Sequence, residues 1–99
     1  MQLAQLWRQH LQAGCPTELK GVEIAGTDAR ALDAEITSCV SAMLTRQFTI
    51  DERMERRLSD ISSALSNKEV EAEQPVADFC HRLNQLVSAV LTETRAGRA

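Results

Sequence analysis

Two histidines, His10 and His81, are the side chains in this 99-residue sequence best suited to metal binding or proton transfer. Helical bundles that bind two metal ions use Glu-x-x-His motifs on facing helices. The residue three positions before His10 is Trp7, and the one three positions before His81 is Asp78, a weaker relative of the motif. Helical spacing places Asp78 and His81 on one face, turned away from the neighbouring apolar stripe. We therefore expect a solvated pair and no metal site.

Three cysteines, Cys15, Cys39 and Cys80, offer thiol chemistry. Their odd number and the lack of Cys-x-x-Cys spacing match neither a disulfide framework nor a zinc site. Cys39 and Cys80 fall on apolar helix faces, where a free cysteine packs as a small hydrophobic residue. A bridge between these two, or a redox role, is the alternative. Cys15 lies in a Gly-Cys-Pro loop, and we expect it to be the accessible thiol.

The hydroxyl and guanidinium groups give no sign of a catalytic or phosphate-binding site. No histidine and no Gly-x-Ser-x-Gly elbow accompanies the serines of the third predicted helix, so nucleophilic catalysis by serine is not expected. Arg53, Arg56 and Arg57 alternate with acidic residues, which is typical of a solvated face with i,i+4 charge pairs. Acidic residues outnumber basic ones 14 to 11, for a net charge of −3. Nucleic-acid binders concentrate positive charge, so we expect no nucleic-acid partner. No cofactor is indicated.

The elements that position these side chains are predicted to be helices. Aromatic residues make up only 3% of the sequence, so the core must consist of aliphatic side chains, which suit helices better than a β-sandwich. We expect an all-α fold, a small four-helix up-down bundle with a long ordered loop between helices 1 and 2. The sequence is short enough for one helical domain over residues 1–99. The helices are expected at about residues 2–13, 28–47, 50–65 and 74–95.

Capping residues define the expected helix boundaries. Gly14 can end the first helix in the left-handed conformation, and Asp28 is a good N-cap for the second. Thr49 and Glu52 have the spacing of a capping box for the third. Pro75 is compatible with the first turn of the fourth. The short link between the second and third helices predicts an antiparallel αα-hairpin, and the wide apolar stripe of the fourth predicts a central position.

The segment at residues 14–27 lacks helical periodicity. Val22 and Ile24 alternate with Glu23, which indicates extended backbone, but we find no second strand to pair with it. We therefore expect an ordered loop, with Leu19, Val22 and Ile24 lying across the bundle. Long connections of this kind are uncommon in compact domains and often carry function.

The sequence has no run of about 18 apolar residues that could span a membrane. Its first residues also lack the basic and apolar regions of a secretory signal. We expect a cytoplasmic protein with no membrane partner.

With no catalytic motif, the sequence favours a small acidic protein–protein interaction module over an enzyme. Such a module would bind or inhibit a protein partner, or form a homodimer. The alternative is an enzyme or ligand-binding bundle with an interhelical pocket, which convergent titratable groups would favour. The candidate interface combines an apolar contact with an acidic rim that could steer a basic partner. Its residues are Trp7, Leu19, Val22 and Ile24 for the contact and Glu69, Glu71 and Glu73 for the rim.

Overall fold

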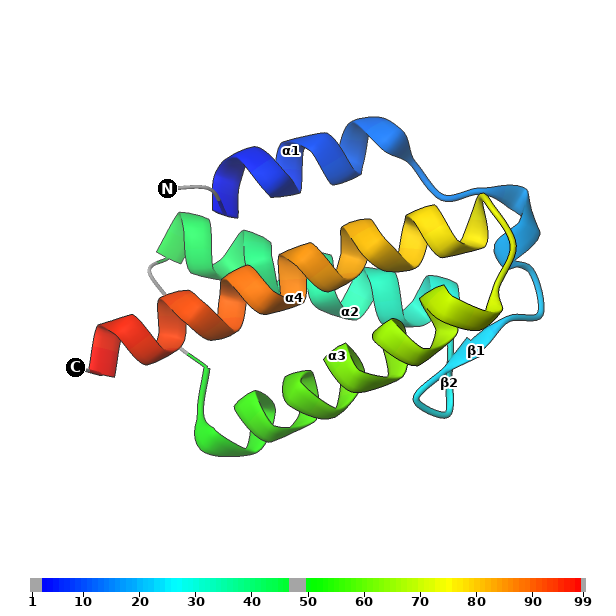
Figure 1. Cartoon of the computed structure of the whole chain (residues 1–99). Coiled ribbons are helices and arrows are strands. Elements are labelled where there is room, and N and C mark those ends of the chain that lie inside the picture. Colours follow the sequence, from blue (N-terminus) through cyan, green and yellow to red (C-terminus); the bar gives the residue numbers. More distant parts are fainter. Residues whose placement is uncertain (1–2, 47–49, 99) are drawn as a thin grey trace.

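The computed structural model describes residues 3–46 and 50–98, and these residues form an up-down bundle of four helices (Figure 1). The all-α prediction is confirmed. Successive helices run in opposite directions, and a small hairpin lies at the end of the bundle where α1 ends and α2 begins (Figure 1). The elements are α1 (Leu3–Ala13), a short 3-10 turn (Thr17–Leu19), β1 (Glu23–Ile24), β2 (Thr27–Asp28), α2 (Ala29–Arg46), α3 (Glu52–Glu71) and α4 (Val76–Arg98).

Helix α4 is the centre of the bundle and packs against α1, α2 and α3. Its apolar residues form a stripe that is wide enough to face several neighbours at once. Removing such large aliphatic and aromatic groups from water is the main source of stability for a fold of this size. The fully buried members of the stripe are Phe79, Cys80, Leu83, Leu86 and Val87. The prediction that this helix is central is thus confirmed.

The expected hairpin of the second and third helices is corrected in one respect. α2 and α3 are antiparallel, but the most extensive helix–helix packing is between α3 and α4. Leu58, Ile61 and Leu65 of α3 are buried, and the wide stripe of α4 provides the surface that they cover. A short connection fixes the direction of two helices, whereas the apolar faces determine which helices pack together.

Two helix starts are fixed by aspartate caps. The Asp28 carboxylate accepts hydrogen bonds from the backbone N–H groups of Arg30 and Ala31, at 3.1 and 3.2 Å, as expected. For α3 the cap is Asp51, which accepts from the N–H of Met54 at 2.8 Å. The expected capping box is therefore replaced by a cap two residues later. Thr49 itself lies outside the described residues.

Helix α3 is longer than predicted. It continues through residues 66–71, which we expected to be a loop, and ends at Glu71 with the N–H of Ala72 bonded to the carbonyl of Lys68 at 2.8 Å. Polar helix formers such as Lys and Glu can extend a helix without burying anything, so apolar periodicity underestimates its length. The connection to α4 is consequently only residues 72–75.

The segment between α1 and α2 also differs from expectation. Glu23–Ile24 does find a partner, Thr27–Asp28, in an antiparallel hairpin with Ile24 opposite Thr27. The two turn residues, Ala25 and Gly26, have φ values of 55° and 75°, the left-handed backbone that a tight hairpin turn requires. The alanine concealed this turn, because the usual signal is Asn or Gly at that position.

No helix in the described part of the chain is both long enough and apolar enough to cross a bilayer.

Candidate functional site

One cluster of titratable groups joins α1, the following loop and α2. The ring of His10 is 4% exposed, and its Nε2–H donates a hydrogen bond to the carboxylate of Asp33, which is 17% exposed. The Cys15 thiol donates to the other oxygen of the same carboxylate, with Sγ and Oδ2 3.6 Å apart. The His10 ring also lies 5.7 Å from the ring of Phe79. One carboxylate therefore holds together three parts of the chain.

This cluster was not predicted from the sequence. A signal was present, since His10 follows Leu3 by seven residues and Trp7 by three, which places it on the inward face of α1. Asp33, its partner on α2, is 23 positions away, and such a distance in sequence cannot be bridged by local spacing rules.

The electrostatics of the cluster favour a structural role over catalysis. Burial and, after it, the negative charge of Asp33 raise the pKa of the Cys15 thiol, although Arg30 and Arg82 oppose the shift. A raised pKa keeps the sulfur protonated, whereas a nucleophilic cysteine needs the thiolate. None of these three side chains lines any of the surface hollows described below. Within the described ranges, no group of three His, Cys, Asp or Glu residues could hold a metal ion.

A surface hollow lies between the β-hairpin segment and the turn from α3 to α4. Its volume is about 370 Å³, and it is lined by Val22, Lys68, Glu71, Ala72, Glu73 and Val76. Val22 and Val76 are half-buried and pack against the core, so they form an apolar floor fixed by the fold. Glu71 and Glu73 are exposed at its edge. We call this feature the α3–α4 hollow.

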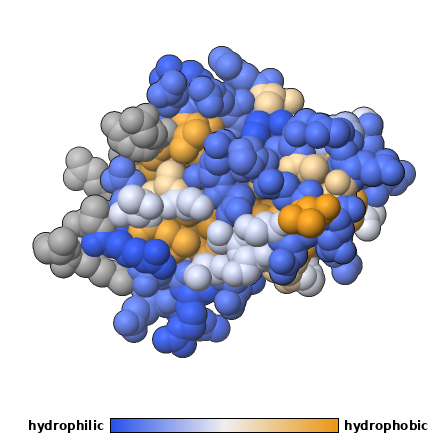
Figure 2. All heavy atoms as spheres, viewed as in Figure 1, coloured by the Kyte–Doolittle hydropathy of each residue, from blue (hydrophilic) through white to orange (hydrophobic). Residues whose placement is uncertain are grey.

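Val70, in the last turn of α3, is 87% exposed, and Figure 2 shows hydrophobic surface over the carboxyl end of this helix among hydrophilic neighbours. It does not line the α3–α4 hollow, because helical spacing directs its side chain away from those of Lys68 and Ala72. The apolar surface of the hollow is therefore that of Val22, Ala72 and Val76.

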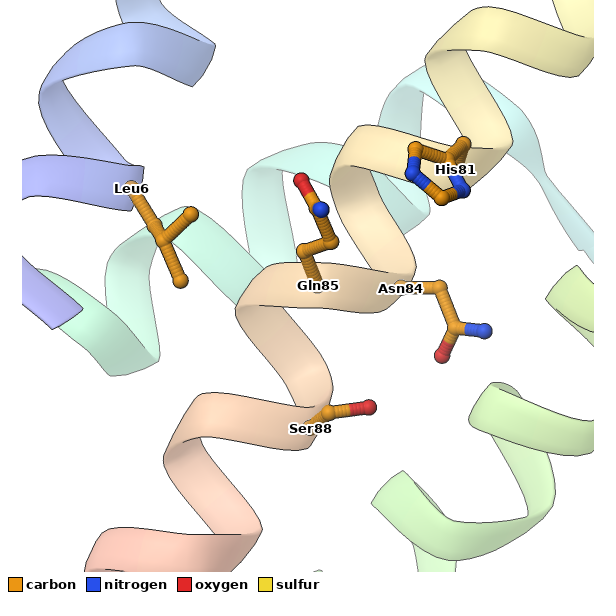
Figure 3. Close-up of a pocket in the computed structure, with 5 residues that line it drawn as sticks. All are labelled: Leu6, His81, Asn84, Gln85 and Ser88. Carbon is orange, nitrogen blue, oxygen red and sulfur yellow. The ribbon is translucent and has the colours of Figure 1, made fainter. Parts of the chain in front are cut away.

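A second groove runs between α1 and α4 (Figure 3). Leu6 projects from α1 toward α4, and the other lining residues follow one side of α4. Two of those residues are already engaged with α3: Nδ1 of His81 lies 3.2 Å from the Glu69 carboxylate, and the Asn84 amide oxygen accepts from the Ser62 hydroxyl at 2.7 Å. The groove has a volume of about 280 Å³ and is lined by Leu6, His81, Asn84, Gln85 and Ser88.

The predicted apolar contact residues separate into core and surface. Leu19 and Ile24 are 0% and 2% exposed, so the prediction that they form a contact surface is corrected: they complete the core beneath the loop. Trp7 is half-buried against the core, and its indole Nε1–H is buried without a hydrogen-bond partner among the described residues. Of the four residues, only Val22 lines the α3–α4 hollow.

The predicted acidic rim is divided in a similar way. Glu71 and Glu73 line the α3–α4 hollow together with Val22, so the structure brings these three candidates to one place. Glu69 is helical and faces His81 instead. The expected partner of His81, Asp78, makes no ion pair with it among the described residues.

The arginines of α3 are partly neutralised within the bundle. Arg57 donates from Nε and Nη2 to the two carboxylate oxygens of Glu35 on α2, at 2.7 and 3.0 Å. This two-point contact lowers the pKa of Glu35, chiefly through the hydrogen bond. Arg56 lies in a shallow hollow with both Glu52 and Glu55, so the charge on this face is mixed, as the sequence indicated.

The chain matches no protein-family model, no curated protein and no solved structure.

Proposed function

We propose that this chain is a protein–protein interaction module that binds a partner through the α3–α4 hollow. The observation that carries the proposal is the α3–α4 hollow itself, whose apolar floor of Val22, Ala72 and Val76 has exposed carboxylates at its edge. Apolar surface left open to water favours association, because an aliphatic side chain of a partner can bury it.

The position of the hollow also supports this function. It lies where the α3–α4 turn, the first turn of α4 and the residue before β1 meet, and Val22 and Val76 of its floor pack against the core. A surface that is already formed before binding loses little conformational entropy when the partner arrives. We place this module in the cytoplasm, a reducing compartment in which its three free cysteines would remain unpaired.

The competing function, an enzyme or a ligand-binding bundle, has one observation in its favour. His10 and Asp33 form an inward-facing titratable pair of the kind found in active sites. His10 and Asp33 are hydrogen-bonded to each other, and Asp33 also accepts from the Cys15 thiol. Neither residue lines the hollows described above. A binding surface at the α3–α4 hollow is therefore the better supported function.

Site-specific photo-crosslinking in the protein's native cells tests this proposal. A benzophenone amino acid replaces Val70 in one variant and Leu11 in the control, because Leu11 is a second exposed aliphatic residue, on α1. We expect a discrete protein adduct from position 70 and none from position 11. Ala72→Gln, which fills the α3–α4 hollow with a longer neutral side chain, should abolish the adduct. Identical adducts at both positions, or none at position 70, would reject the proposed function.

A further inference from the structure

The charges around the α3–α4 hollow are mostly negative. Residues 69–78 contain four acidic residues and no lysine or arginine. Glu71 and Glu73 line the hollow, and neither carboxylate forms an ion pair among the described residues. Lys68 is the one cation of the lining. The hollow therefore presents two unpaired carboxylates against a single ammonium group.

The apolar part of the hollow limits the shape of what it can hold. A volume of about 370 Å³ is at the small end of the range for ligand pockets. It has room for one or two side chains of a partner, rather than for the face of a whole domain. The floor of Val22, Ala72 and Val76 contains no polar side chain, so the inserted group must be aliphatic to avoid an unpaired polar atom.

We infer that the partner presents a short segment in which an aliphatic side chain lies next to lysine or arginine. This inference rests on the proposed function and specifies the chemistry of the partner. The aliphatic side chain occupies the α3–α4 hollow, while the neighbouring cations meet Glu71 and Glu73 at its edge. Such complementarity contributes mainly to specificity and to the rate of encounter.

The Arg53–Arg57 segment of a second copy of the chain is a weaker candidate for this occupant. The densest basic sequence of the chain is Arg53, Arg56 and Arg57, but these arginines lie on a helix interleaved with acids, and Arg57 is paired with Glu35. The neighbouring aliphatic residue Leu58 is buried. A second copy therefore cannot supply an exposed aliphatic side chain beside free cations from this segment.

A matched pair of synthetic peptides tests the inference. Both carry a central leucine, flanked by lysine and arginine in one peptide and by glutamate in the other. Each is titrated into the folded 15N-labelled chain at low salt, and amide shifts are followed. We expect the basic peptide to bind with a Kd below about 1 mM, to shift the amides of Val70, Glu71 and Ala72, and to bind more weakly as salt is added. The acidic peptide should not bind.

Charge reversal supplies one test variant and one matched control. Glu71→Lys combined with Glu73→Lys should weaken the basic peptide at least about tenfold, since two close attractive contacts become repulsive. Asp60→Lys combined with Glu93→Lys changes the net charge equally at exposed positions away from the hollow, and should change Kd less than about twofold. The inference is overturned by equal binding of both peptides, by shifts confined to another surface, or by no shift up to about 1 mM. If any of these occurs while the position-70 adduct persists, the proposed function stands and only the basic class of partner is rejected.

Discussion

His10 on α1 donates a hydrogen bond to the carboxylate of Asp33 on α2, although the two residues are 23 positions apart in the sequence. The carboxylate also accepts from the Cys15 thiol. This contact ties α1 and the loop that follows it to α2. Four buried side-chain atoms of the described residues lack a hydrogen-bond partner, and Nδ1 of His10 is one of them. Nε2 is therefore the hydrogen-bonding nitrogen of this ring.

Removing the Asp33 carboxylate is expected to destabilise the fold by about 2 kcal/mol, the usual effect of losing a hydrogen bond to a charged group. Urea unfolding of Asp33→Ala measures this loss. Asp60→Ala, an exposed acid on α3, serves as the control and should change stability by about 0.5 kcal/mol or less. In a double-mutant cycle, His10→Ala and Asp33→Ala should be clearly non-additive. Additivity within about 0.5 kcal/mol would show that the pair contributes nothing.

Alkaline pH is expected to weaken the fold through its thiols. Burial is the first cause of a raised pKa at Cys15, Cys39 and Cys80. In the window above the ordinary thiol pKa of about 8.5, the unfolded chain has lost protons that the folded chain keeps. Unfolding then releases protons, so stability is full below this pH and decreases as pH rises.

Chemical denaturation between about pH 7 and 10 measures this slope, because thiols titrate in that range. Cys80→Ala should be less stable at neutral pH because it leaves a cavity, yet its stability should decline less steeply with pH. If the free energy of unfolding of Cys80→Ala depended on pH as steeply as that of the wild type, Cys80 would not contribute to the alkaline loss of stability.

The three thiols should react with a labelling reagent in the order of their exposure. The rate at each thiol should also depend on the fraction that is deprotonated. Cys15 is exposed, Cys39 is half-buried and Cys80 is buried, so Cys15 should react first with iodoacetamide. Its raised pKa should nonetheless make it slower at pH 8 than an unstructured cysteine peptide, because less thiolate is present. Asp33→Asn removes the second cause of the raised pKa and should accelerate labelling. A native Cys15 that reacts faster than the peptide would rule out this electrostatic description.

The contact between Glu35 and Arg57 predicts a loss of stability in acid. The hydrogen bond from Arg57 lowers the pKa of Glu35, so its contribution is present above the ordinary carboxyl pKa of about 4.3 and is lost as pH falls. Both side chains are more than a third exposed, at 35% and 41%, and we expect at most about 1 kcal/mol at neutral pH. Glu35→Gln should show this loss at pH 7 and converge with the wild type near pH 3. A constant difference across this range would indicate a packing effect instead.

The inward and outward faces of α4 give a contrast within one helix. Leu83 is 0% exposed, whereas Ser88 is on the surface. Leu83→Asp should prevent folding, because an unpaired buried carboxylate costs several kcal/mol or more, comparable to the whole stability of a small domain. Ser88→Asp should change stability by about 0.5 kcal/mol or less. Circular dichroism melts that are equal for both variants would contradict the described orientation of α4.

Local rules predicted much of this fold. The Asp28 cap, the left-handed Gly14 after α1 and the wide stripe of α4 each depend on residues within a few turns of one another. The end of α3 was missed because residues 66–71 extend the helix without burying an apolar stripe. The hairpin was missed because its partner strand is only Thr27–Asp28.

The candidate site was predicted only in part, for a related reason. Glu71 and Glu73 were recognised from their composition, and Val22 from its place in an unusual loop. Their meeting at one hollow depends on how the loop packs beside the α3–α4 turn, which is tertiary information. Leu19 and Ile24 were assigned to the interface but lie in the core. Their apolar character fits both places equally well, and only the tertiary packing distinguishes the two.

The most direct test of the central claim is an amide hydrogen-exchange footprint of the partner that crosslinks at position 70. Exchange is measured on the chain alone and on the complex. The account predicts slower exchange over residues 68–76 and at Val22, with α1 unchanged. Protection over α1 and the groove at Leu6, with residues 68–76 exchanging as in the free chain, would contradict it.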